Sequence, residues 1–301
     1  MVQITEGTFQ IGDVSLYTKT WMPDGPPKAN MVMIHGFSDH INRYYDFFPA
    51  LAARGIAVQG FDQRGWGRSV RTPSDRGNTG PTATVLADIA AFVRSKLSET
   101  TPLFVLGHSM GGGEVLALAC DPAYEDVVRR VRGWVLEAPF LGFAPELQPH
   151  WITIASGKLA ARLVPRFQLY RPIPPEDVTR DPEVQRSIRE DTLMHMYGTL
   201  EGLAGLLDRT DKLARGEMRL NKSVNSVFLA HGSADHATSM EKAKKWYDAQ
   251  TQLEDRRFKA YEGFYHQLHA DPGKEEFYQD VGDWILARCD DGTRSAPESK
   301  L

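Results

Sequence analysis

Short apolar runs alternate with amphipathic helical patterns along most of the chain. The apolar runs predict strands at residues 31–34, 56–61, 103–106, 133–137, 227–230 and 258–261. The helical patterns predict helices at residues 44–53, 82–97, 111–120, 239–249 and 275–287. Strands that alternate with helices are typical of βαβ units, so the sequence predicts an α/β fold with a mostly parallel sheet and helices on both faces.

Two segments depart from this alternation. Residues 5–23 alternate between polar and apolar positions around a Gly-Asp turn, which predicts an antiparallel hairpin. Residues 139–216 are rich in proline and mix polar turns with amphipathic pieces at 151–163 and 193–207, without a strand-helix rhythm. An insertion near strand ends, where ligands bind in open α/β sheets, predicts a helical cap over an active site. A second, unrelated domain is the alternative interpretation.

The predicted organisation is therefore one α/β domain interrupted by its cap. A chain of 301 residues is long enough for such a domain with an insertion. The core is predicted at residues 1–138 and 217–289, the cap at 139–216, and a flexible polar tail at 290–301.

The composition is that of an ordinary globular protein and excludes several classes. Hydrophobic residues make up 42% and charged residues 25% of the chain, and the net charge of −4 offers no basic surface for nucleic acid. Cys120 and Cys289 are far apart and form no disulfide framework. No apolar run approaches the roughly 20 residues that span a bilayer. The N-terminus lacks the basic start and apolar run of a secretory signal.

The segment Gly107-His108-Ser109-Met110-Gly111 fits the pattern G-x-S-x-G. It follows the apolar strand at 102–106 and opens the helix at 111–120, which is the sharp strand-to-helix turn that the pattern requires. The helix N-terminus behind Ser109 favours a developing negative charge. Ser109 is therefore the candidate nucleophile, and a chance glycine-rich turn is the alternative.

A serine hydroxyl needs a base, and the base needs an acid to orient it. In this fold the partners follow in the order Ser, acid, His. Asp235 follows the strand at 227–230 directly and is the candidate acid, and His266 follows the strand at 258–261 and is the candidate base. The alternatives are Asp208 or Asp211 for the acid and His269 for the base.

An oxyanion hole needs two backbone N–H donors. One is expected from Met110, directly after the nucleophile, and the other from Phe37 in the loop at 35–40. His35 has no second His or Cys at ligand spacing, so it is interpreted as structural, and the sequence predicts neither a metal site nor a cofactor.

The chain ends in Ser299-Lys300-Leu301, after a polar stretch with no apolar face. This tripeptide is the address read by the peroxisomal import receptor. For a eukaryotic source, we therefore expect a peroxisomal location, and otherwise a cytoplasmic or lipid-droplet-associated protein.

With these residues in place, the chain resembles the monoacylglycerol lipase family, α/β-hydrolases of the serine aminopeptidase S33 or hydrolase-4 type, in the form of a fungal-like member. The blocks that carry the resemblance are residues 35–44, 61–69, 107–112, 232–235 and 261–269. The resemblance implies the triad Ser109, Asp235 and His266, and a mobile cap that admits a fatty acyl chain.

The resemblance also implies a polar end that holds glycerol. The matching positions here are Asp39, Arg43 and His269. Asp39 stands where the family has a longer glutamate, and Ile188 lies nearest to the position of a cap tyrosine. The expected reaction is hydrolysis of monoacylglycerol to glycerol and fatty acid through an acyl-enzyme on Ser109.

Other functions stay open at the level of sequence. Within hydrolases, the alternative is a peroxisomal esterase or acyl-CoA thioesterase of lipid or secondary-metabolite metabolism. From another class, the chain could be a hydrolase-derived binding protein without activity. The apolar side of residues 151–163 either lines an acyl tunnel or makes transient contact with a membrane surface.

Overall fold

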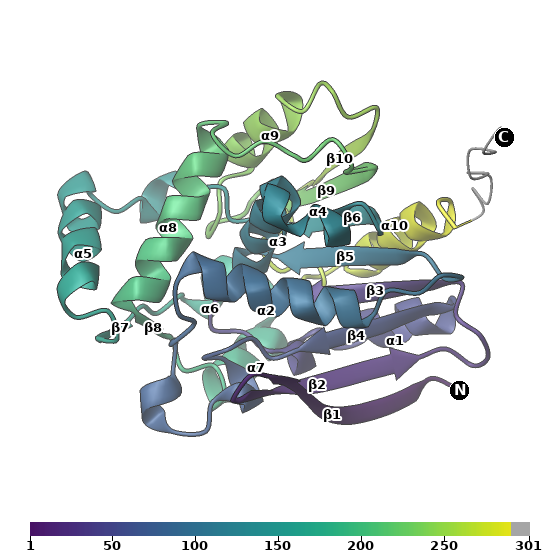
Figure 1. The fold of residues 1–301 in the computed structure, drawn as a ribbon, viewed down its shortest axis with the longest axis horizontal. Coiled ribbons are helices and arrows are strands. Elements are labelled where there is room, and N and C mark those ends of the chain that lie inside the picture. The colour runs from purple at the N-terminus through teal and green to yellow at the C-terminus, as the bar shows by residue number, and fades with distance from the viewer. Residues whose placement is uncertain (290–301) are drawn as a thin grey trace, which may run out of the picture.

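A sheet of eight strands occupies the centre of the computed structural model, which describes residues 1–289 (Figure 1). Its strands are β1 (Gln3–Ile11), β2 (Val14–Met22), β3 (Ala29–Ile34), β4 (Ile56–Phe61), β5 (Leu103–His108), β6 (Val131–Glu137), β9 (Ser226–Gly232) and β10 (Asp255–Tyr261). They follow the order β1-β2-β4-β3-β5-β6-β9-β10. All pairs from β4 to β10 are parallel, and only the hairpin strands β1 and β2 run antiparallel to their neighbours. The predicted α/β-hydrolase fold is confirmed.

Helices cover both faces of this sheet (Figure 1). The core helices are α1 (Phe47–Ala53), α2 (Thr82–Ser95), α3 (Met110–Cys120), α4 (Glu125–Val128), α9 (Met240–Asp248) and α10 (Glu275–Leu286). On one face, α1 and α10 pack against the sheet in a cluster that includes Met31 and Phe104. On the other face, α2, α3 and α9 pack in a cluster that includes Val32 and Val105. Because adjacent strand residues point to opposite faces, both faces of β3 and β5 must be apolar, which explains their continuous apolar runs.

The residues between β6 and β9 form the cap, which extends from the left to the lower centre of Figure 1. Its elements are α5 (Trp151–Leu163), β7 (Gln168–Tyr170), α6 (Pro175–Val178), α7 (Pro182–Glu190), β8 (Tyr197–Thr199) and α8 (Leu200–Ala214). A buried ion pair joins α8 to the core, because Arg209 Nη2 lies 3.1 Å from Glu114 Oε1 on α3. The Arg209 side chain also donates to Thr82 Oγ1 at 3.0 Å, at the start of α2. The predicted tail, residues 290–301 with Ser299-Lys300-Leu301, lies outside the described residues.

Three details of the cap and its surroundings differ from the prediction. The amphipathic piece at 193–207 does not correspond to one element, because residues 197–199 form β8 and a helix runs from Leu200 to Ala214. The cap also contains a small antiparallel sheet, β7 with β8, that no apolar run in the sequence indicated. The helix expected at 44–53 begins only at Phe47, since Tyr45 has a positive φ of 42°.

Over residues 1–289, no helix combines the length and apolarity needed to cross a bilayer.

Close approach of α3 to β3 gives a prediction about stability. A Cβ added at Gly111 would lie 2.2 Å from the backbone oxygen of Ile34, which cannot move aside easily. We expect Gly111→Ala to lower the free energy of unfolding by about 2 kcal/mol or more. Urea denaturation followed by circular dichroism measures this change.

The same substitution at Gly157, within α5, is the matched control. An added Cβ there meets no atom within 4 Å. Alanine is favoured over glycine inside a helix, so Gly157→Ala should raise the stability by about 0.5–1 kcal/mol. A Gly111→Ala protein as stable as the unmodified chain would contradict the close packing of α3 on β3.

Candidate active site

Ser109 lies in a sharp turn between β5 and α3. Its φ of 53° and ψ of −118° are strained for a residue with a side chain. Backbone contacts hold the turn, because the Ser109 N–H donates to the Glu137 carbonyl at 3.0 Å and the Ser109 carbonyl accepts from the Phe140 N–H at 2.8 Å. These bonds to the end of β6 and the residues after it offset the strain and fix the position of the serine side chain.

Asp235 and His266 form a buried hydrogen-bonded pair. His266 Nδ1 lies 2.8 Å from Asp235 Oδ2. The other oxygen, Oδ1, accepts the N–H groups of Ala237 at 2.7 Å and Thr238 at 2.9 Å. Burial acts to raise the pKa of Asp235, but the neighbouring His266 and His231 outweigh it and hold that pKa well below its usual range. Asp235 is therefore ionised and orients the imidazole.

His266 and Ser109 meet at one cavity of about 310 Å³. Among the described residues, both hydrogen bonds of the His266 ring use Nδ1, which leaves Nε2 to accept a proton from Ser109. Burial alone would lower the pKa of His266, yet the Asp235 carboxylate outweighs this and raises it. The structure thus brings the three predicted triad residues together from the ends of three strands.

Phe37 and Met110 border the same cavity as Ser109. Met110 is the first residue of α3, so its N–H has no partner within the helix. Within residues 1–289, the hydrogen bonds of the protein also leave the Phe37 N–H without an acceptor. Two free N–H groups beside a nucleophile are the arrangement that stabilises an oxyanion. The fully buried His35 uses both ring nitrogens, toward the Gly36 carbonyl at 2.8 Å and from the Gln63 N–H at 2.9 Å, as expected for a structural histidine.

The cavity of about 310 Å³ extends from Ser109 into the cap. Its walls there are apolar side chains of the cap, among them Ile154, Leu169, Leu200, Leu203 and Leu207. Two basic side chains, Lys158 and Arg171, also border it. An apolar tunnel of this kind fits a hydrocarbon chain whose reactive end lies at the serine.

A smaller cavity of about 40 Å³ lies on another side of Ser109 and His266. Asp39 borders it and accepts hydrogen bonds from the Tyr44 hydroxyl and the His40 N–H, each at 2.8 Å. Burial acts to raise the pKa of Asp39, but His108 and the other nearby histidines hold it well below its usual range. The cavity therefore presents a buried, ionised acceptor close to the nucleophile.

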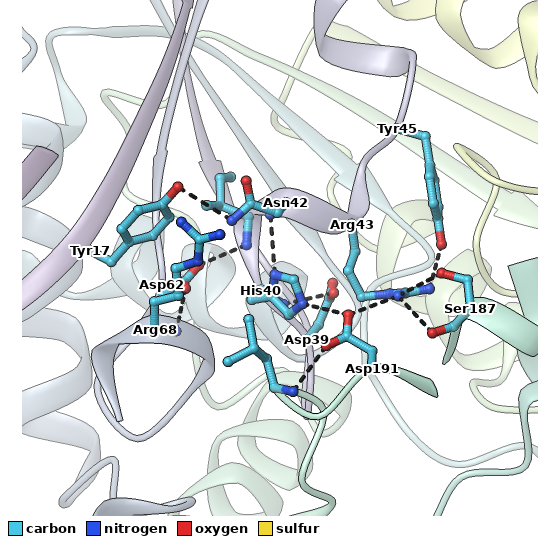
Figure 2. Close-up of polar contacts among 12 residues, drawn as sticks. Tyr17, Asp39, His40, Asn42, Arg43, Tyr45, Asp62, Arg68, Ser187 and Asp191 are labelled. Carbon is cyan, nitrogen blue, oxygen red and sulfur yellow. Dashed lines mark hydrogen bonds and ion pairs between the residues drawn. The ribbon is translucent and has the colours of Figure 1, made fainter. Parts of the chain in front are cut away.

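Of the three residues expected at the polar end, only Asp39 borders either cavity. Arg43 is buried and points to the cap, where it contacts Asp191 and Ser187 (Figure 2). His269 is fully buried and its Nδ1 lies 2.7 Å from Glu137 Oε1. The same enclosure removes His269 as an alternative base, since its ring does not reach the cavity that Ser109 borders.

One buried cluster in the described part of the chain holds three groups of the kind that bind metals. Ligand-type atoms of His108, Glu137 and His269 lie within 4.8 Å of one another. The Glu137 carboxylate is already hydrogen-bonded to the N–H and the ring of His269, so we interpret the group as a polar cluster. Burial acts to raise the pKa of Glu137, but His269 and His108 outweigh it and lower that pKa. The negative charge of Glu137 also helps to raise the pKa of His266.

Sequence reasoning missed two polar residues of the small cavity, His108 and Gln267. Each is adjacent in sequence to a triad residue, and that adjacency was the available signal. It was not sufficient, because neighbours of a catalytic residue face the site only when the local turn directs them there.

Comparisons with known proteins show the family and the fold of the chain. The family model described as "Serine aminopeptidase, S33" (Hydrolase_4) matches residues 25–273. The chain is 31% identical over 274 residues to the "Putative monoglyceride lipase" of Schizosaccharomyces pombe, which covers 90% of this chain and 71% of that protein. It is 27% identical over 287 residues to the monoacylglycerol lipase of Mycolicibacterium smegmatis, covering 92% and 95% of the two chains.

Solved structures share the fold. A soluble variant of the monoglyceride lipase from Saccharomyces cerevisiae, in complex with a substrate analog, superposes with a TM-score of 0.84 at 21% identity over 94% of each chain. The monoacylglycerol lipase of Paleococcus ferrophilus gives a TM-score of 0.78 at 24% identity, over 91% of this chain and 99% of that one.

The raised pKa of His266 gives a prediction about pH. Because only the neutral imidazole can take the Ser109 proton, kcat/KM for an ester should fall as the pH drops through a pKa above the ordinary histidine value of about 6.5. In Asp235→Asn the main contribution that raises this pKa is lost, so the acid limb of the residual activity, which is reduced by about 10⁴-fold, should move to lower pH. Rates followed in a pH-stat measure both profiles.

The matched control is Asp208→Asn, which removes an aspartate paired with Lys212 on the surface of α8. Its pH profile should equal that of the unmodified protein. An Asp235→Asn profile with its acid limb at the unmodified position would show that Asp235 does not set the pKa of His266.

Proposed function

We propose that this chain, which belongs to the monoacylglycerol lipase family of the serine aminopeptidase S33 type, hydrolyses monoacylglycerol to glycerol and a free fatty acid. The chain is a carboxylic ester hydrolase with the α/β-hydrolase fold. The choice of substrate rests on the asymmetry of space around Ser109. An apolar cavity of about 310 Å³ lies on one side, and a cavity of about 40 Å³ that contains the Asp39 carboxylate lies on another.

The reaction follows from the roles of the residues. His266 Nε2 removes the proton of Ser109, and the serine oxygen attacks the ester carbonyl. The N–H groups of Phe37 and Met110 stabilise the oxyanion. His266 then gives its proton to the leaving alcohol, and an acyl-enzyme remains on Ser109. Water, activated by His266 in the same way, releases the fatty acid.

The two cavities divide the substrate between them. The fatty acyl chain extends into the apolar cap cavity, where it loses contact with water. The glycerol lies toward the small cavity, where a hydroxyl donates to Asp39. The protein groups supply each step, so the proposal invokes no cofactor.

An acyl-CoA thioesterase is the second candidate. Lys158 and Arg171 at the large cavity are cations of the kind that bind phosphate groups. Against this reading, no lysine or arginine of residues 1–289 lines the alcohol-side cavity of about 40 Å³. The peroxisomal location, which rests on Ser299-Lys300-Leu301, stays a prediction.

We also propose that α5 contacts the lipid surface from which a poorly soluble substrate is drawn. None of its residues is buried, and several of its large apolar side chains face outward, with Trp151 70% and Leu163 78% exposed. An amphipathic helix that exposes large apolar side chains partitions into a membrane interface.

The catalytic proposal predicts the behaviour of Ser109→Ala. Release of oleate from 2-monooleoylglycerol should fall by about 10⁴-fold or more, and labelling by a fluorophosphonate should disappear. Ser98→Ala, at a surface serine between α2 and β5, is the control and should change neither readout. The unmodified protein should also prefer 2-monooleoylglycerol to oleoyl-CoA. Faster turnover of oleoyl-CoA would favour the thioesterase, and an unlabelled, inactive protein would favour a binding protein.

The membrane proposal predicts that the protein floats with phosphatidylcholine vesicles in a density gradient. The double variant Leu159→Asp/Leu163→Asp should float much less, because it places charges on the exposed side of α5. Ile4→Asp changes a comparably exposed side chain on the core, 52% exposed, and should float like the unmodified protein. Absence of flotation for the unmodified protein would dismiss the contact.

A further inference from the structure

A short part of the cap, residues 191–196 between α7 and β8, lies against the loop that follows β3 (Figure 2). Its first residue, Asp191, contacts two side chains of that loop. Asp191 Oδ2 accepts from His40 Nε2 at 2.9 Å and from Arg43 Nη1 at 3.0 Å. This loop, residues 35–46, is called the oxyanion loop because it carries Phe37, the oxyanion donor; it also carries Asp39, the carboxylate of the small cavity.

Arg43 adds further bonds at the end of α7. Its Nη1 donates to Ser187 Oγ at 3.2 Å and to the Ser187 carbonyl at 3.4 Å, and its Nη2 donates to the Tyr45 hydroxyl. The Arg43 side chain is only 4% exposed and that of Asp191 18%. Burial acts to raise the pKa of Asp191, but His40 and Arg43 outweigh it and lower it to about 2. The contact is therefore an ionic one, largely shielded from water, across the boundary of cap and core.

The other end of residues 191–196 is held as well. The Met196 N–H donates to Ser38 Oγ at 3.0 Å. His195 Nε2 lies 2.9 Å from the Gly65 carbonyl, and its ring stacks on Trp66 at 5.0 Å. Trp66 in turn packs edge-on against Phe37 at 4.8 Å. The segment is thus fixed to the oxyanion loop at both ends.

Side chains in and beside this segment form the cap wall of the small cavity. Ile188, Met194 and Met196 line it, together with Asp39. A space of about 40 Å³ is small, since one water molecule needs about 10–15 Å³. A modest shift of the wall would therefore change which alcohols fit. The residues named for the acyl cavity lie on other parts of the cap, whereas Asp191 contacts the loop that carries Asp39.

We infer that Asp191 is a positioning residue for alcohol specificity: by holding His40 and Arg43, it fixes the cap wall opposite Asp39 and so selects the alcohol of the ester. The inference deepens the proposed function and rests on it for the identity of the alcohol, glycerol. In this inference Arg43 holds the cap through Asp191 and Ser187 and makes no direct contact with glycerol.

The test compares two esters of one acyl group, 2-monooctanoylglycerol and p-nitrophenyl octanoate. Both form the same acyl-enzyme, so the kcat for the activated ester reports deacylation, and kcat/KM reports the steps up to loss of each alcohol. In Asp191→Asn, we expect kcat/KM for the glyceryl ester to fall by about tenfold or more, with kcat for the p-nitrophenyl ester within about twofold of the unmodified value. Arg43→Lys keeps the charge but loses the planar fork. It should also lower kcat/KM for the glyceryl ester relative to kcat for the p-nitrophenyl ester.

Glu176→Gln is the matched control, because Glu176 pairs with Arg189 of α7 on the surface of the cap and does not touch the oxyanion loop. It should leave both esters unaffected. Equal losses on both esters in Asp191→Asn would overturn the inference, since the oxyanion loop or the fold would then be damaged as a whole. Unchanged rates on both would overturn it too. If circular dichroism shows that Asp191→Asn does not fold, Arg43→Lys and Ser187→Ala test the inference instead. The readout is again kcat/KM for the glyceryl ester relative to kcat for the p-nitrophenyl ester.

Failure of the proposed substrate gives a different result. An unmodified protein that turns over p-nitrophenyl octanoate but not 2-monooctanoylglycerol refutes the monoacylglycerol proposal. Methyl, propyl and butyl octanoates then replace the glyceryl ester in the same comparison. Asp191→Asn should still alter their relative kcat/KM values, and identical relative values would overturn the inference about Asp191.

Discussion

The site depends on one constraint of the sheet: the carboxyl ends of parallel strands meet at a common edge. β5, β9 and β10 end there, and the loops that follow them carry Ser109, Asp235 and His266. β6 lies between β5 and β9 and supplies no member of the triad. It supplies instead the Glu137 carbonyl that holds the Ser109 turn and the Glu137 carboxylate that contacts His269. Strand order, and not distance along the chain, therefore brings the reacting groups together.

The electrostatics of this edge are those of buried carboxylates held by histidines. Burial opposes ionisation of Asp39, Glu137 and Asp235, yet neighbouring imidazoles lower the pKa of each. Their negative charges raise the pKa of His266 and so favour the imidazolium that forms during attack. The same charges disfavour an oxyanion. The N-terminus of α3 and the two free N–H groups therefore have to provide the positive potential on the other side of Ser109.

Two parts of the cap differ in how they are held. α5 buries none of its residues and borders the acyl cavity with Ile154, and the other apolar residues named for that cavity lie on β7 and α8. Residues 191–196 are held by ionic and hydrogen bonds to the oxyanion loop. Apolar packing tolerates acyl chains of different shape, whereas a directional ionic clamp fixes distances. The cap thus combines an adaptable acyl side with a defined alcohol side.

The sequence by itself determined the alternation of strands and helices, the turn at Ser109 and the order of the triad, because periodicity and turn chemistry are local properties of the chain. Only the tertiary structure decided the pairing of β7 with β8, which divides the amphipathic piece at 193–207, since strands of three residues gain their stability from a distant partner. It also decided the roles of Arg43 and His269. The sequence blocks at 35–44 and 261–269 place both residues near the site. However, Arg43 binds Asp191, 148 positions away, and His269 binds Glu137, 132 positions away. Which way a side chain points depends on what folds against it, and no local pattern contains that information.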